Sequence, residues 1–163
     1  MRLDGRIAVV TAGGSGMGRA GAIKLAEEGA TVYVTDLDGD AAAETAAAIE
    51  AAGGRAESRS VDVLDHDQLE RLFADVEDAH GKLHVLWNHA GAPGPAGLEA
   101  TEQAFDFAMD LNVKSAYFAT ALAEDLLAAG TARPRSSSPP RCPAWSARPA
   151  ARSTRSPRAG SRP

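Results

Sequence analysis

The chain has 163 residues, of which 44% are hydrophobic, and a formal net charge of −5. That length accommodates one domain with a sizeable core, and no apolar run approaches the roughly 20 residues that a membrane-spanning helix needs. The single cysteine, Cys142, excludes an internal disulfide and a cysteine-rich zinc site, so we expect a cytoplasmic protein without a membrane segment or a metal.

A glycine-rich turn, Thr11-Ala-Gly-Gly-Ser-Gly-Met-Gly18, stands between a predicted strand and a predicted helix. Residues 6–11 are apolar and β-branched, which is typical of a parallel strand buried on both faces. Residues 17–28 place Ala20, Ile23 and Ala26 on one face of a helix. Glycines let the backbone approach a ligand closely, and the helix N-terminus offers N–H groups to a diphosphate. The alternative is a loop that merely needs glycine.

A second strand, residues 31–35, is followed by Asp36, eighteen residues after Gly18. This spacing is close to that of a carboxylate that hydrogen-bonds the adenosine ribose of a dinucleotide. Such a charged hydrogen bond contributes roughly 1.5–3 kcal/mol, whereas a 2′-phosphate would meet like charge. The neighbouring Leu37 provides no compensating base, so the sequence favours NAD over NADP. In the alternative interpretation, Asp36 is an ordinary residue at a strand end.

The rest of residues 1–130 continues the alternation of strands and helices. The sequence predicts a helix capped by Asp40 and ending near residue 52, a strand over 56–63, a helix over 65–81, a strand over 83–87 and helices over 101–129. The resulting βαβαβαβ order predicts a Rossmann-like, doubly wound parallel sheet in three α/β/α layers. We expect the sheet to be truncated after the fourth strand and the helices that follow it, and we place this incomplete domain at residues 1–130.

With these elements in place, residues 3–130 resemble the N-terminal half of a short-chain dehydrogenase/reductase domain. The resemblance rests on the glycine-rich turn, Asp36, Asp62-Val63, Asn88-His-Ala-Gly91 and Asn112-Val-Lys, in that order. It implies that Asn112 is a catalytic residue that holds a water in a proton relay, or else only a polar residue that bends its helix. It also implies that the dinucleotide is bound by Gly13, Ser15, Gly16, Met17, Gly18, Asp36, Leu37, Asp62, Val63, Asn88, Ala90 and Gly91.

Two residues depart from the family pattern. Ala12 stands where the family usually has its first glycine, and a left-handed backbone there would cost alanine about 1 kcal/mol. His89 replaces the second asparagine of the Asn-Asn-Ala-Gly motif, so a hydrogen bond that steadies the site is expected to be rearranged.

The resemblance implies an NAD-dependent oxidoreductase that acts on a small-molecule alcohol or carbonyl, and a homo-oligomer where the full-length domain exists. Catalysis in the family uses a serine and a tyrosine with a lysine four residues later, and residues 131–163 contain neither tyrosine nor lysine. We therefore expect this chain to be impaired in catalysis. The alternative is a non-catalytic half-domain that binds a dinucleotide.

Residues 131–163 differ in composition from the rest of the chain. They hold eight arginines, no acidic residue and seven of the nine prolines, whereas residues 1–130 hold all 22 acidic residues. We interpret this tail as disordered or as an out-of-frame reading, because a shifted frame turns Ser136–Ser138 into three hydrophobic codons. A nucleic-acid-binding arm is disfavoured, since Trp145 is its only aromatic residue. Without a fifth strand, residues 83–87 should form an exposed apolar edge.

Overall fold

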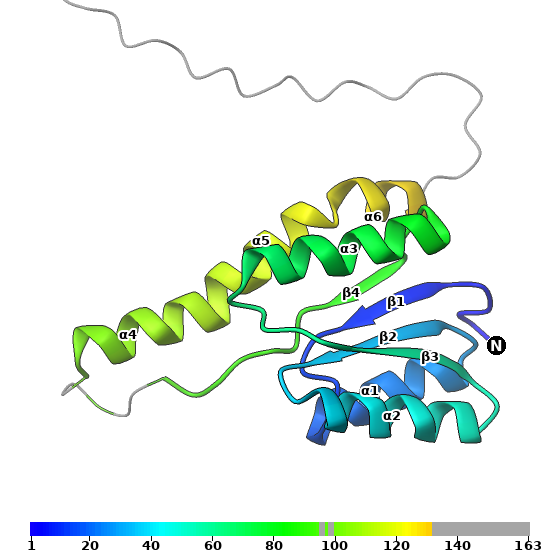
Figure 1. The fold of residues 1–163 in the computed structure, drawn as a ribbon, viewed down its shortest axis with the longest axis horizontal. Helices are drawn as coiled ribbons and strands as arrows, with labels where there is room; N and C mark the ends of the chain where they lie inside the picture. Colours follow the sequence, from blue (N-terminus) through cyan, green and yellow to red (C-terminus); the bar gives the residue numbers. More distant parts are fainter. Residues whose placement is uncertain (95–96, 98–99, 132–163) are drawn as a thin grey trace, which may run out of the picture. The chain divides into compact units, whose positions relative to one another are not determined.

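A computed structural model describes residues 1–94, 97 and 100–131, so the arginine-rich tail lies outside the described residues (Figure 1). None of the described helices is long and apolar enough to cross a membrane. The elements in chain order are β1 (Ile7–Val10), α1 (Gly16–Glu27), β2 (Thr31–Asp36), α2 (Gly39–Ala51), β3 (Arg55–Ser60), α3 (His66–His80), β4 (Val85–Trp87), α4 (Glu102–Met109), the π-helical turn η1 (Asp110–Lys114), α5 (Ser115–Leu122) and α6 (Glu124–Thr131).

The described strands form one parallel sheet in the order β3-β2-β1-β4. Val9 in β1 lies opposite Tyr33 in β2 and Leu86 in β4. The chain winds outward from β1 to β3 and then crosses back to the far side of β1. The carboxyl ends of β1 and β4 therefore border a topological switch point, which is where ligands bind in open α/β sheets.

Two hydrophobic cores, one on each face of the sheet, give the three predicted layers (Figure 1). Ile7 and Val9 of β1 contribute to the core beneath α3, α5 and α6. The alternate residues Ala8 and Val10 contribute to the core beneath α1 and α2. All four residues of β1 are buried because both faces and both edges of this strand are covered.

Several expected details are wrong at the level of single residues. The carboxylate of Asp38, not that of Asp40, caps α2 and accepts hydrogen bonds from the N–H groups of Asp40 and Ala41. Helix α1 packs through Gly18, Ala22 and Ala26, whereas Ala20 is exposed. Glycines and alanines lie on every side of α1, so no single face of the helix is distinctly more hydrophobic than the others. The buried face therefore could not be identified from the sequence.

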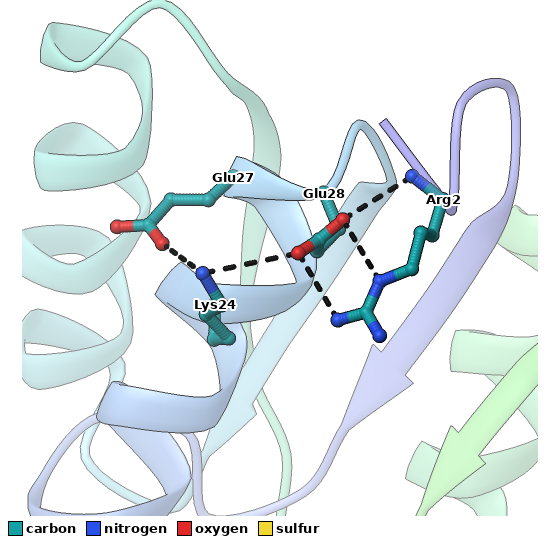
Figure 2. Close-up of polar contacts among 4 residues, drawn as sticks. All are labelled: Arg2, Lys24, Glu27 and Glu28. Carbon is teal, nitrogen blue, oxygen red and sulfur yellow. Dashed lines mark hydrogen bonds and ion pairs between the residues drawn. The ribbon is translucent and has the colours of Figure 1, made fainter.

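The N-terminal segment is anchored to the end of α1 (Figure 2). The Arg2 guanidinium lies 3.1 Å from Glu28 Oε1, and Leu3 N donates to Glu28 O at 2.8 Å. Hydrogen bonds from the Arg2 side chain, and then from its backbone, lower the pKa of Glu28 to about 2. Lys24 pairs with Glu27 at 2.8 Å on the same helix turn. These contacts fix the segment that leads into β1.

His84 joins β1 and β4 in a way that requires a neutral imidazole. The imidazole Nδ1 of His84 accepts from Ile7 N at 2.9 Å, and the backbone N–H of His84 donates to Ile7 O at 2.9 Å. Burial, followed by the charges of Arg6 and Lys82, lowers the pKa of His84. An imidazolium has no free lone pair at Nδ1, so protonation removes this acceptor.

We expect acid to destabilise the fold through His84. In the unfolded chain His84 binds a proton below its ordinary pKa of about 6.5, whereas in the native protein the lowered pKa keeps the imidazole neutral to lower pH. The free energy of unfolding therefore falls as the pH drops through this range. Urea unfolding at pH 7.5 and pH 5.5 measures this loss. His84→Asn keeps an acceptor for the Ile7 N–H but does not titrate, so its loss should be smaller. An equal loss in both proteins would contradict the assignment.

Candidate functional site

The glycine-rich turn is held by hydrogen bonds to the carboxyl end of β2 and to α2. Gly13 N donates to Thr35 O at 2.9 Å, and Gly14 N donates to Asp36 Oδ2 at 2.8 Å. The buried Thr45 hydroxyl donates to Gly14 O at 3.2 Å. The turn is therefore fixed before any ligand binds, as preorganised recognition requires.

The shape of the turn leaves no room for a side chain at Gly14 or Gly18. A Cβ on Gly18 would overlap the carbonyl oxygen of Ala12, and one on Gly14 would lie 2.9 Å from Asp36 Oδ2. Gly16 has φ +52° and faces open space. Among the described contacts, the Ser15 side chain makes no capping bond to α1. The first N–H groups of this helix are thus available to an anion, so the turn fits a diphosphate.

Asp36 lies beside this turn at the tip of β2. Its Oδ2 accepts from Gly14 N at 2.8 Å and its Oδ1 from Asp38 N at 3.1 Å. Each carboxylate oxygen has two lone pairs, so the group can still accept from the hydroxyls of a sugar. The side chains of Met17 and Leu37 are 74% and 71% exposed, which leaves the approach to the carboxylate open.

Ala12 has φ +52°, and among the described residues it is the one non-glycine residue with positive φ. Ala12 therefore has the left-handed backbone conformation that was expected to cost alanine stability. We expect Ala12→Gly to raise the free energy of unfolding by up to about 1 kcal/mol, since relief of left-handed strain exceeds the added freedom of the unfolded chain. Urea unfolding measures this change. A destabilised Ala12→Gly variant would show that the alanine methyl group contributes more than the strain costs.

Thr11 holds two loops of the candidate site together, a connection that the sequence did not predict. It is 1% exposed at the end of β1, and its hydroxyl oxygen accepts from His89 N at 2.9 Å and from Ala90 N at 3.0 Å. One side chain thereby joins the loop after β1 to the loop after β4, across the switch point. A hydroxyl on the first residue of the glycine-rich turn, where the apolar strand ends, was the available signal.

We expect Thr11→Val to destabilise the protein by about 1–2 kcal/mol, because two backbone N–H groups lose their acceptor while the volume stays similar. Thr11→Ser keeps the hydroxyl and is the matched control. Thermal unfolding of the three proteins measures the difference. If the valine and serine variants melt together, the hydroxyl does not hold the loops.

Residues 88–91 connect β4 to the helices on one face of the sheet. Asn88 Nδ2 donates to Thr120 Oγ1 at 3.1 Å, and the rings of Trp87 and His89 lie 5.0 Å apart. A Cβ on Gly91 would lie 2.6 Å from Asn112 Oδ1, so this glycine permits a close approach. The ring of His89, in the position where the family has an asparagine, therefore packs against the ring of Trp87.

Asn112 lies in η1, where the helix is widened by one residue. Its Nδ2 donates to Ala92 O and to Ala108 O, both at 2.9 Å, and its Oδ1 accepts from Ala92 N at 3.2 Å. The side chain thus ties the loop that follows Gly91 to the helix. In this arrangement both amide hydrogens of Asn112 are engaged with the backbone, so its direct role is to position the loop.

Asp62 and Val63 follow β3, farther along the same edge of the sheet. Asp62 Oδ1 accepts from Leu64 N at 2.9 Å, which turns the chain toward α3. Val63 lines a cavity of about 370 Å³ together with Phe118. Because parallel strands end at one edge, the predicted residues after all four strands lie along that edge.

Sequence comparisons find related proteins. The sequence model of the family described as short chain dehydrogenase matches residues 6–133. The chain is 38% identical over 119 residues to 3beta-hydroxysteroid dehydrogenase of Mediterraneibacter gnavus, a match that covers 72% of this chain and 43% of that protein. It is 36% identical over 115 residues to 7alpha-hydroxysteroid dehydrogenase of Escherichia coli K12, covering 71% of this chain and 45% of that protein.

Solved structures are similar as well. The crystal structure of hydroxysteroid dehydrogenase from Escherichia coli matches with a TM-score of 0.71 and 34% identity, covering 75% of this chain and 52% of that one. A 7alpha-hydroxysteroid dehydrogenase complexed with NADH and 7-oxo glycochenodeoxycholic acid matches with a TM-score of 0.73 and 34% identity, covering 77% and 49%. The chain spans about half the length of these relatives.

Proposed function

Because the chain belongs to the short-chain dehydrogenase family, we propose that it binds NAD(H) at the carboxyl edge of its sheet and derives from an oxidoreductase acting on alcohols and carbonyls. The observation that carries the proposal is the hydrogen bond between Gly14 N and Asp36 Oδ2. This bond places a carboxylate directly beside the turn that fits a diphosphate, as dinucleotide recognition requires.

Each predicted residue has a part in this proposal. The turn residues Gly13, Ser15, Gly16, Met17 and Gly18 hold the pyrophosphate, while Asp36 accepts from the adenosine ribose with Leu37 beside it. Asp62 and Val63 meet the adenine, and Asn88, Ala90 and Gly91 line the second ribose. When bound, the nicotinamide supplies or accepts hydride. Asn112 orients the loop after Gly91 and, as the family resemblance implies, holds a water for proton transfer.

The substrate class follows from the relatives. Two of them are named as hydroxysteroid dehydrogenases, so we assign a secondary alcohol or ketone on a bulky apolar skeleton, in a cytoplasmic homo-oligomer. No Tyr-x-x-x-Lys sequence occurs in the 163 residues, and such a tyrosine supplies the proton in this family. The chain therefore binds the dinucleotide without efficient turnover. In the alternative, it is a half-domain whose function is binding alone.

Titration of the whole chain with NADH and with NADPH, followed by nucleotide fluorescence, tests the proposal. We expect saturable binding that is tighter for NADH, and no oxidation of a 7α-hydroxysteroid in the presence of NAD. A folded chain that binds neither nucleotide at millimolar concentration would overturn the proposed function. Oxidation of the steroid would contradict only the expected loss of catalysis and would leave the proposed nucleotide binding intact. Sequencing the gene across the codons before Pro134 tests the out-of-frame interpretation of residues 131–163.

A further inference from the structure

His89, which stands where the family has an asparagine, lies against the first turn of α1. A Cβ on Gly18 would be 2.8 Å from His89 Cδ2, so the imidazole occupies the space that this glycine leaves open. The ring of Trp87 lies in the same way against Gly21, and the centres of the two rings are 5.0 Å apart. Two rings at the carboxyl end of β4 therefore contact the end of α1 at which the diphosphate is proposed to bind.

The imidazole of His89 is held in place without any hydrogen bond to its ring. The backbone N–H of this residue donates to Thr11 Oγ1 at 2.9 Å, which fixes the start of the side chain. Among the described residues no group hydrogen-bonds to either ring nitrogen, and neither nitrogen is fully buried, in contrast to His80 Nε2. The polar atoms of the ring are therefore accessible to water and to protons while the ring itself stays packed.

The elements that contact His89 bring little charge to it. Apart from His89 itself, β1, the glycine-rich turn, β4 and residues 88–92 contain no ionisable side chain. Asp36 bonds to the turn at Gly14 N, 2.8 Å away. The charged residues of α1 each have an oppositely charged partner on a helix surface, Arg19 with Glu44 and Lys24 with Glu27. Within the described part of the chain, His89 thus has no carboxylate paired with it.

A diphosphate at the turn would change the charge balance around this ring. The positive end of α1 opposes an imidazolium beside it, whereas a bound diphosphate attracts one. Histidine is the side chain that changes its charge near neutral pH, and asparagine carries no charge at any pH. We propose, on the basis of the nucleotide site proposed above, that His89 is a further binding residue, whose imidazolium strengthens the binding of the diphosphate as the pH falls. By linkage, nucleotide binding draws a proton onto His89.

Titration of the whole chain with NADH at pH 6.0, 7.0 and 8.0 tests this role, with circular dichroism to show that the chain is folded at each pH. We expect binding to be at least about threefold tighter at pH 6.0 than at pH 8.0. ADP-ribose, which has the same diphosphate but no nicotinamide, should show the same dependence in competition with NADH. His89→Asn should bind with nearly the same affinity at every pH. His84→Asn, at the opposite end of β4, is the matched control and should keep the dependence.

Calorimetry supplies a measurement that a merely structural role would not change. Titrations with NADH at pH 7.0 in two buffers of different ionisation enthalpy should show proton uptake by the unmutated chain and none by His89→Asn. His89→Gln serves as a second uncharged variant if the asparagine variant does not fold. An equal pH dependence with and without His89 would overturn this inference and leave nucleotide binding intact, as would tighter binding at pH 8.0. A folded chain that binds neither nucleotide at any of these pH values would overturn the proposed function as well.

Discussion

Gly18→Ala is expected to lower the free energy of unfolding by about 3 kcal/mol, the upper end for overpacking, and to weaken NADH binding at least about tenfold. The added Cβ would overlap the carbonyl oxygen of Ala12 and lie 2.8 Å from His89 Cδ2. The carbonyl belongs to the backbone and cannot rotate away, so α1 must move off the turn. Urea unfolding and nucleotide fluorescence measure the two effects.

Gly16→Ala is the matched control, two residues away in the same turn. A Cβ on Gly16 meets nothing within 4 Å, but the residue has φ +52°. Alanine there should cost only the strain of the left-handed conformation, about 1–2 kcal/mol. Equal losses in the two variants would mean that α1 does not approach the turn closely at residue 18.

The fold could be predicted because β1, β2 and β4 are short apolar runs and glycines follow α1, α2 and α3. Boundaries were less accurate where side chains redirect the backbone. The strand expected over 56–63 ends at Ser60, since Asp62 then accepts from Leu64 N and starts a turn. The widened turn η1 contains Asn112, for which the sequence offered only a bend in the helix, whereas the bonds from its side chain to Ala92, twenty residues away, could not be predicted.

The site was predictable in its residue types but not in its connections. The glycines and Asp36 follow from spacing alone, whereas the bond between Gly14 and Asp36 requires β1 and β2 to be adjacent. Thr11 was missed because its partners, His89 and Ala90, lie more than 75 residues away. A single sequence does not show which buried hydroxyl meets which distant N–H group.

Asp36→Asn is expected to remove the proposed preference for NAD. Loss of a charged hydrogen bond to the ribose, worth roughly 1.5–3 kcal/mol, should weaken NADH binding about tenfold or more. The affinity for NADPH should rise or stay unchanged, because the carboxylate no longer repels the 2′-phosphate. The asparagine side-chain oxygen can still accept from Gly14 N, so the glycine-rich turn should keep its shape, while the bond from Asp38 N is lost. Parallel titrations with both nucleotides measure the ratio of the two affinities.

Asp38→Asn separates this effect from a general loss of negative charge. Asp38 lies two residues beyond Asp36 and is exposed, and its carboxylate caps α2 through Asp40 N and Ala41 N. Asparagine is an equally good N-cap, so stability should change little and the preference for NADH should persist. If Asp38→Asn changed the ratio of NADH to NADPH affinity as much as Asp36→Asn does, the summed negative charge of this loop would select the nucleotide, and a direct hydrogen bond from Asp36 would not. A direct hydrogen bond predicts that only position 36 matters, because the turn holds that carboxylate beside the proposed diphosphate site.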